Sequence, residues 1–239
     1  MTNLGSTKIL VIEDDYHLRH ITKLALQGDG FTVLESANAK DGVQIFENEA
    51  PGLILLDLKL PDQYGLEICK RVRAHPKLST TPIIILTSES DIEKKITGLT
   101  AGADQYLTKP IPTLELVAWV KALLRRLDYS KEGEGTLRCG DLSVDPQAHL
   151  VKIKDRIIGH LTRKEFDLLY LLVKKRPQII SRKYVLSKLW HEILVDRVVD
   201  VHIGHLREKL GPDLGNKIET VPGKGYRFWE QREPGESSD

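Results

Sequence analysis

The chain has 239 residues, of which 41% are hydrophobic and 29% charged, and this length and composition predict two ordinary globular domains. No apolar stretch approaches the ~18 residues that span a bilayer, the first residues lack the apolar core of a secretion signal, and two cysteines make no disulfide framework, so we expect a protein of the reducing cytoplasm. Residues 137–230 carry 18 basic and 12 acidic side chains, against 15 and 16 in residues 1–127, which is a mild indication of nucleic-acid binding that a solvated basic face would explain equally well.

The first half alternates short apolar segments with amphipathic stretches of helical period. The strand-like segments are residues 8–13, 31–36, 53–57, 82–88 and 104–107. This alternation predicts an α/β fold over residues 1–127, a (βα)5 doubly wound parallel sheet of the flavodoxin-like kind with helices on both faces. Ligands of such sheets bind at the carboxyl ends of the strands.

A change of composition separates this half from a second domain. Residues 128–136 are polar and rich in glycine, which predicts a linker. Residues 137–160 contain three short strand-like pieces that predict a small antiparallel sheet, and helical stretches follow. We therefore expect an α+β domain over residues 137–231, and the polar residues 232–239 predict a disordered tail.

Three helices and a hairpin are predicted within the second domain. Thr162 and Glu165 have the spacing of a capping box at the start of the first helix, and Ser181 is placed to cap the second. The third helix runs from about Asp196 to Leu210, and a glycine directly after it is a stop signal. Two strand-like segments then flank the turn PGKG, which predicts a hairpin.

Charged and hydroxyl side chains follow the parallel strands at their carboxyl ends. They are Glu13, Asp14 and Asp15 after the first strand, Asp57 after the third, Thr87 and Ser88 at the end of the fourth, and Lys109 after the fifth. Because these ends meet at one edge of a parallel sheet, the carboxylates would repel one another unless a hard divalent cation lies among them. Oxygen ligands of this kind suit Mg²⁺. Asp57 would then be paired with a metal ion and with Lys109.

Phosphoryl chemistry follows from such a site. A carboxylate beside Mg²⁺ can attack a phosphoryl group and become an acyl phosphate. The metal ion and Lys109 would neutralise charge on the phosphoryl oxygens, and the Thr87 hydroxyl would donate a hydrogen bond to one of them. The simpler interpretation is that the acidic residues after the first strand only cap the next helix. We favour capping for Asp15, and the metal and phosphoryl roles for Asp14 and Asp57 together with Lys109.

Two sets of motifs resemble known domains. VIEDD, LLDLKLPDQYG, IILTS and GADQYLTKP resemble the receiver domain of bacterial response regulators. LTRKEFDLL, ISRKYVL, VDVHIGHLREKLG and ETVPGKGYRF resemble the winged-helix output domain of the OmpR/PhoB type. Together the two sets cover all but the linker and the tail. The resemblance implies a two-component regulator in which phosphorylation of a receiver controls a DNA-binding domain.

The resemblance also implies roles for residues of the predicted receiver. Asp57 would be the phosphoacceptor. Mg²⁺ would be held by Asp14, Asp57 and the backbone carbonyl of Lys59, and Glu13 would reach the ion through water.

Further family features concern movement and the rim of the site. Thr87 and Tyr106 would form a switch pair in which the ring turns inward when Thr87 moves. A cis peptide bond after Lys109 would fit the family. Lys59 and Glu89 carry opposite charges at the rim, where they could pair across the mouth of the site, although two solvated charges are an equally good interpretation.

The resemblance implies that the third helix of the second domain enters the major groove of DNA and that the hairpin tip enters the adjacent minor groove. Apolar residues at i, i+4, i+7 and i+11 form its core stripe, namely Val199, Ile203, Leu206 and Leu210. The expected DNA contacts are Val198, Val201 and His205 to bases, Arg207, Lys224 and Arg227 to phosphates, and in addition Arg197 and His202.

The chain departs from the common family pattern at two points of this surface. Many members have consecutive arginines where this chain has Gly204 and His205, and many have arginine at the hairpin tip where this chain has Pro222. A glycine inside a helix costs ~1 kcal/mol relative to alanine, which close approach of the backbone to DNA would offset.

A dimer surface is expected on the fourth helix, fifth strand and fifth helix of the receiver. Lys95 and Glu115 match one charge pair of the family, whereas Gln105 and Trp119 replace another. The helical pattern places Trp119 on the outward side, where an exposed tryptophan would anchor an interface. The alternative is that its ring packs within its own domain.

The sequence thus predicts a transcriptional regulator and not an enzyme. Its partners would be a sensor histidine kinase, double-stranded promoter DNA and RNA polymerase, and it would form a homodimer when phosphorylated. A regulator that binds DNA independently of phosphorylation, with the receiver serving only for dimerisation, is the alternative. A phosphohydrolase is a further hypothesis, disfavoured because Lys59 stands where a second aspartate would act as general acid.

Overall fold

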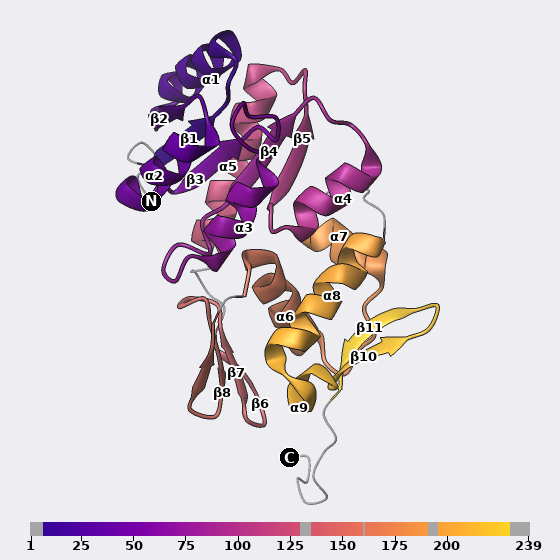
Figure 1. Ribbon diagram of the computed structural model, residues 1–239. Coiled ribbons are helices and arrows are strands. Elements are labelled where there is room, and N and C mark those ends of the chain that lie inside the picture. The colour runs from indigo at the N-terminus through magenta and orange to yellow at the C-terminus, as the bar shows by residue number, and fades with distance from the viewer. Residues whose placement is uncertain (1–6, 130–134, 160, 191–195, 230–239) are drawn as a thin grey trace, which may run out of the picture. The chain divides into compact units, whose positions relative to one another are not determined.

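The computed structural model describes residues 7–129, 135–159, 161–190 and 196–229 (Figure 1). The chain divides into two compact units, Met1–Glu132 and Gly133–Asp239. The predicted linker and tail lie largely outside the described residues, although the last helix of the first unit continues to Tyr129. Within the described part of the chain, no helix is both long and apolar enough to cross a membrane.

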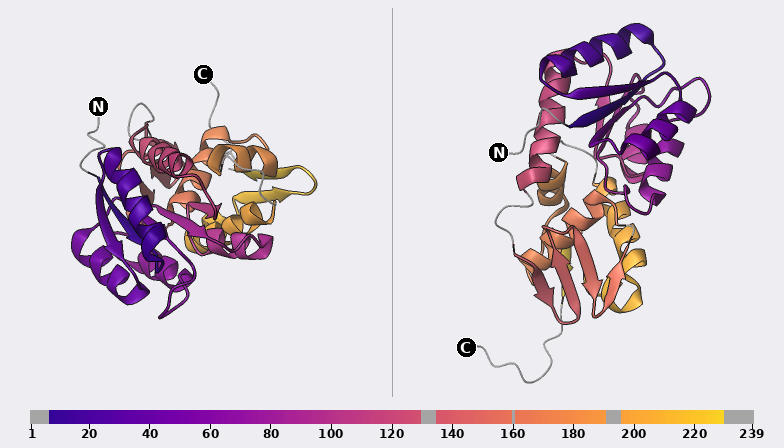
Figure 2. Two further views of the ribbon diagram at one scale, coloured as in Figure 1. Left: turned by 90° about the horizontal axis from the view of Figure 1, so that it is seen from above. Right: turned by 90° about the vertical axis from the view of Figure 1, so that its left-hand side faces the viewer.

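The first unit is a five-stranded parallel sheet in the order β2-β1-β3-β4-β5, as the alternating pattern predicted. The strands are β1 Lys8–Ile12, β2 Thr32–Ser36, β3 Leu53–Leu56, β4 Ile83–Thr87 and β5 Gln105–Thr108. The helices are α1 Tyr16–Gly28, α2 Ala39–Glu49, α3 Leu66–Ala74, α4 Ile92–Thr100 and α5 Thr113–Tyr129. Helices α1 and α5 cover one face of the sheet, and α2, α3 and α4 cover the other (Figure 2). Because both faces are covered, every residue of β3 and β4 is buried, which explains their continuous apolar runs.

The register of this sheet brings the predicted site together. Ile12 pairs with Leu56, Leu56 with Ile85, and Thr87 with Thr108. The residues that follow these strands therefore emerge at one edge of the sheet, on loops that are adjacent in space although distant in sequence. This is the edge at which ligands of doubly wound sheets bind.

The second unit is an α+β winged-helix fold, as predicted. A four-stranded antiparallel sheet comprises β6 Leu137–Cys139, β7 Leu142–Asp145, β8 Leu150–Ile153 and β9 Arg156–Ile158. The helices are α6 Arg163–Lys175, α7 Arg182–Leu189, α8 Arg197–Leu210 and the short α9 Pro212–Gly215, which the sequence pattern did not predict. Strands β10 Ile218–Val221 and β11 Gly225–Phe228 form the terminal hairpin.

N-capping residues begin helices α6 and α7 at the predicted positions. The Thr162 hydroxyl accepts from the backbone N–H of Glu165 at 3.3 Å, and the Glu165 carboxylate accepts from the N–H of Thr162 at 2.6 Å, which confirms the capping box. Ser181 accepts from the N–H of Tyr184 at 3.2 Å and caps α7.

The hairpin is fastened to the body of the second unit by a close backbone contact. Tyr226 and Ile180 exchange two backbone hydrogen bonds of 2.8 and 3.0 Å. Gly225 has φ of +143°, and a Cβ added there would lie 2.1 Å from the Ile180 carbonyl oxygen. Only glycine combines this conformation with this approach, so the position of the hairpin depends on that residue.

A buried arginine stabilises the receiver sheet at the amino ends of β4 and β5. The Arg73 guanidinium donates to three backbone carbonyls and one carboxylate at 2.6–2.9 Å, those of Gly102, Ser79, Thr81 and Asp104. The side chains of Arg73 and Asp104 are 8% and 1% exposed. The contact joins α3 to the segments that precede β4 and β5.

We expect Arg73→Met to lower the free energy of unfolding of the first unit by ~3–5 kcal/mol, because it leaves the Asp104 carboxylate buried without its cation. Chemical denaturation followed by circular dichroism measures the loss. Lys70→Met is the matched control, since the pair of Lys70 with Glu67 is exposed on the same helix and is worth ~0–1 kcal/mol. Equal losses in the two variants would contradict this role of Arg73.

Candidate functional site

Three acidic side chains meet at the carboxyl edge of the receiver sheet. One carboxylate oxygen from each of Glu13, Asp14 and Asp57 lies within 4.8 Å of the others. Glu13 and Asp57 are buried, with 5% and 7% exposure, whereas Asp14 is exposed. This donor set of hard oxygens, open to solvent on one side, fits Mg²⁺, which binds through few carboxylates and keeps several of its waters.

An ammonium group compensates the two buried carboxylates. The Nζ atom of Lys109 lies 2.5 Å from Glu13 Oε2 and 2.5 Å from Asp57 Oδ2. Burial disfavours the ammonium, but hydrogen bonds to Asp57 and Glu13 outweigh burial and raise the pKa of Lys109. Burial also raises the pKa of Glu13, an effect that Lys109 partly offsets. The peptide bond between Lys109 and Pro110 is cis, as the family resemblance implied.

The loop after β3 positions Asp57. Its Oδ1 atom accepts from the backbone N–H of Lys59 at 3.0 Å, which leaves Oδ2 to Lys109. The N–H of Gly65 donates to the Leu58 carbonyl at 2.8 Å. A Cβ added to Gly65 would lie 2.4 Å from the backbone oxygen of Asp57, so only glycine allows α3 to start this close to the acidic residue.

The predicted switch pair lies on the two strands that follow β3 in the sheet, with Thr87 at the end of β4 and Tyr106 in β5. Thr87 is fully buried, and Tyr106 is 1% exposed with its ring turned inward. The Tyr106 hydroxyl donates to the backbone carbonyl of Glu89 at 2.9 Å, and burial raises the pKa of Tyr106 to about 12. A Cβ added to Gly98 would lie 2.9 Å from the ring, so this glycine of α4 makes room for the inward position.

Glu89 has more partners at the rim of the site than the sequence indicated. The predicted pair with Lys59 is present at 4.0 Å. Shorter bonds come from the Tyr64 hydroxyl at 2.5 Å and from Lys94 Nζ at 2.6 Å. Although burial opposes it, the hydrogen bonds from Lys94 and Tyr64 lower the pKa of Glu89. Glu89 thus connects the loop after β3 to helix α4.

Asp15, the remaining acidic residue, serves the helix. Its Oδ1 atom accepts from the backbone N–H of Leu18 at 3.0 Å, so it is the N-cap of α1, as predicted. This hydrogen bond lowers the pKa of Asp15.

The buried face of α8 is wider than predicted. The core stripe of Val199, Ile203, Leu206 and Leu210 is confirmed. Val198 and His202, however, are also buried, with 0% and 1% exposure. The prediction that they contact DNA is wrong, because neither side chain can reach a base edge without leaving the core. Burial lowers the pKa of His202 to about 3.

The other predicted DNA contacts lie at the surface. Arg197 and Lys224 are exposed, and Val201 and His205 are half-buried. Two arginines have contacts within the unit that the sequence did not reveal. Arg207 donates to the Ile218 carbonyl and the Thr220 hydroxyl, and Arg227 pairs with Glu219 and lies 4.4 Å from the Trp229 ring.

At the expected dimer surface, the structure differs in one respect from what the helical pattern predicted. Trp119 is not an exposed anchor: it is half-buried and packs against the hydrophobic core of the receiver. Gln105 is buried, Lys95 is half-buried and Glu115 is exposed.

Two family models match the chain, that of the response regulator receiver domain over residues 9–121 and that of the C-terminal domain of transcriptional regulatory proteins over residues 158–228. The probable transcriptional regulator ycf27 of Porphyridium aerugineum is 40% identical, over 92% of this chain and 95% of its own. The phosphate regulon transcriptional regulatory protein PhoB of Rhizobium meliloti is 38% identical, over 92% and 97%. A solved structure of a RitR mutant superposes with a TM-score of 0.73 at 27% identity, over 94% of this chain and all of that one.

The matched regions contain the sites described above. The receiver match includes the carboxylates, Thr87 and Lys109, and the second match includes α8 and the hairpin. The chain therefore belongs to the two-component response regulators of the OmpR/PhoB type, transcriptional regulators in which a receiver domain precedes a winged-helix DNA-binding domain.

Proposed function

We propose that Asp57 accepts a phosphoryl group from a sensor histidine kinase in a reaction that requires Mg²⁺, and that this step controls the binding of the winged-helix domain to promoter DNA in the cytoplasm. The observation that supports the proposal is the Lys109 ammonium within 2.5 Å of both buried carboxylates. Mg²⁺ would be held by Asp14, Asp57 and the backbone carbonyl of Lys59, and Glu13 would contact the ion through a water molecule. When bound, Mg²⁺ neutralises charge on the phosphoryl oxygens.

The protein groups around Asp57 account for the rest of the chemistry. Asp57 is 7% exposed at an edge of the sheet, so a donor can reach its carboxylate from solvent. Once Asp57 carries the phosphoryl group, the Lys109 ammonium can pair with a phosphoryl oxygen in place of the carboxylate. The hydroxyl of Thr87, buried beside the carboxylates, can donate to another.

A chain of contacts connects this event to the surface formed by α4 and β5. A movement of Thr87 carries the segment that contains Glu89, and the Tyr106 hydroxyl follows through its bond to the Glu89 carbonyl. Tyr106 lies in β5 and packs against α4. We therefore place the phosphorylation-dependent homodimer on the surface of α4, β5 and α5, where Lys95 and exposed Glu115 supply charge.

In the second unit, α8 is the element that would enter the major groove. Of the DNA contacts predicted on this helix, Arg197, Val201 and His205 are accessible, and Lys224 lies at the tip of the hairpin. Arg207 and Arg227 hold the hairpin through their internal contacts and add charge near the backbone of DNA. The bound dimer would recruit RNA polymerase.

We expect acetyl phosphate to phosphorylate the purified protein only when Mg²⁺ is present, and Asp57→Ala to abolish incorporation, because Asp57 is the proposed phosphoacceptor, whereas Glu13, the other carboxylate beside Lys109, is proposed to reach the metal ion through water. Intact-protein mass spectrometry measures the product. Asp15→Ala is the control and should label normally, since Asp15 caps a helix. Labelling of Asp57→Ala, or equal DNA affinity with and without the phosphoryl group, would refute the proposal and favour a phosphorylation-independent regulator.

Base preference should depend on Val201. Selection of bound sequences from a randomised pool should show that Val201→Ala loses preference for thymine at one position, because valine contacts the thymine methyl group. Lys224→Ala, the control, should keep the sequence preference but lower the slope of log affinity against log salt by ~0.9. An unchanged motif with Val201→Ala would exclude this side chain from readout.

Gly204 offers a separate test of the α8 surface. Apart from the neighbouring backbone of α8 itself, no atom of the described residues lies within 4 Å of a Cβ added there, so Gly204→Ala should raise the free energy of unfolding of the second unit by ~0.5–1 kcal/mol. The same change should weaken DNA binding, because the methyl group occupies space that the backbone of α8 leaves for DNA. Thermal unfolding and fluorescence anisotropy measure the two effects. A stabilised variant with unchanged DNA affinity would place Gly204 away from the groove.

A further inference from the structure

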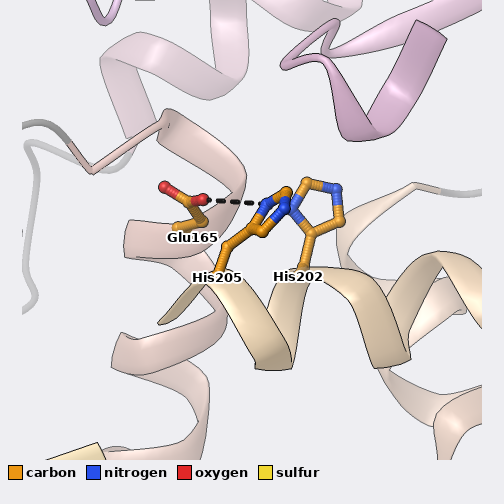
Figure 3. Close-up of side chains that lie close together, drawn as sticks. All are labelled: Glu165, His202 and His205. Atoms are coloured by element: carbon orange, nitrogen blue, oxygen red, sulfur yellow. Dashed lines mark ion pairs between the residues drawn. The ribbon is translucent and has the colours of Figure 1, made fainter. Parts of the chain in front are cut away.

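A second group of metal-binding side chains lies in the winged-helix unit. Glu165 is in the first turn of α6, and His202 and His205 are three residues apart on α8 (Figure 3). One ligand atom from each of the three lies within 4.8 Å of the others. Residues three apart on a helix project to the same side, and this side of α8 faces the start of α6.

His202 is buried without a polar partner. It is 1% exposed, and neither ring nitrogen has a hydrogen-bond partner among the described residues. Its nearest aromatic neighbours are Trp190, whose ring centroid is 5.1 Å away, and His205 at 6.3 Å. Buried polar atoms in folded proteins are normally hydrogen-bonded or coordinate an ion, so two orphaned nitrogens on one ring need an explanation.

Hydrogen bonds hold the Glu165 carboxylate in place through its Oε2 atom. Its Oε2 atom accepts from the Thr162 N–H and from Lys209 Nζ, both at 2.6 Å. Its Oε1 atom faces Nδ1 of His205 at 3.6 Å, which is too long for a hydrogen bond. That separation is close to the ~3.4 Å between two ligand atoms of a tetrahedral zinc site with bonds of ~2.0–2.1 Å.

We propose that Glu165, His202 and His205 form a binding site for a divalent transition-metal ion of the Zn²⁺ class. Two imidazole nitrogens and one carboxylate oxygen suit such an ion and do not suit Mg²⁺, which prefers oxygen ligands alone. The side chain of His205 is 42% exposed, so a fourth position on the ion would be open to solvent. Thr162 and Lys209 donate hydrogen bonds to the Glu165 carboxylate and fix its orientation.

Two nearby ammonium groups oppose a cation at this place. Lys164 donates to the Leu189 carbonyl and lies 5.3 Å from the centroid of the Trp190 ring, so it has acceptors of its own. Lys209 bonds to the oxygen of Glu165 that points away from His205, and its side chain is 31% exposed and can turn to solvent. The positive charges reduce the affinity, but both ring nitrogens of His202 remain without a hydrogen-bond partner among the described residues.

The ion would connect the start of α6 to the middle of α8. His205 lies in the helix that we propose to read DNA, so the metal would restrict the position of that helix within the second unit. Coordination through Nδ1 would leave the other ring nitrogen of His205 as a hydrogen-bond donor.

The test is a calorimetric titration of Zn²⁺ into the full-length protein without an affinity tag, in excess Mg²⁺ to occupy the receiver carboxylates. We expect one ion per chain. His205→Ala and Glu165→Gln should each weaken binding at least tenfold, and glutamine keeps the capping box at that position. His20→Ala is the matched control, because His20 is an exposed histidine three residues after another on α1, and it should leave the affinity unchanged.

Cobalt provides a second measurement that reports on geometry. Co²⁺ bound at the proposed site should give the intense visible absorption of a four-coordinate ion, and His205→Ala should lose it while the far-ultraviolet circular dichroism stays the same. Absence of Zn²⁺ binding, equal affinity in wild type and His205→Ala, or loss of binding in His20→Ala alone would overturn the proposal. None of these measurements involves DNA or phosphorylation, so they fail or succeed independently of the proposed function.

Discussion

The Lys109 ammonium between Glu13 and Asp57 is the interaction around which the receiver is arranged. Two carboxylates with 5% and 7% exposure repel each other at the ends of neighbouring strands, and burial raises the pKa of Glu13. The Lys109 ammonium, 2.5 Å from both carboxylates, offsets their repulsion and leaves Asp57 at the open edge of the sheet. The sheet register and the glycine at position 65 both serve this arrangement, because each fixes where Asp57 lies relative to the cation.

Most of the receiver could be predicted because its signals are local. Four apolar residues of β3 followed by Asp57 predict both a buried strand and the position of its polar end, and the parallel topology then brings such ends together. The partners of Glu89 could not be predicted in this way. Tyr64 and Lys94 come from a loop and a helix whose approach depends on tertiary packing, and no spacing in the sequence relates either one to Glu89.

The sequence-based predictions that the structure corrected concerned how much of a helix surface is buried. Periodicity locates the centre of an apolar stripe, but the width that becomes buried depends on what packs against it. Trp190 lies beside His202, so α8 buries that residue and Val198 in addition to the predicted stripe. In α5 the same effect makes Trp119 pack against the receiver core. A polar residue such as His202 gives no sign in the sequence that it lies inside.

The separation of the charged residues along the chain has a consequence for biosynthesis. Lys109 follows Glu13 by 96 residues and Asp57 by 52, and it comes directly after β5, the last strand of the sheet. Proteins emerge from the ribosome from the N-terminus. A nascent chain that pairs β1 with β3 before Lys109 has been translated brings two like charges together without their cation, so electrostatics oppose this pairing until translation has passed the final strand of the sheet.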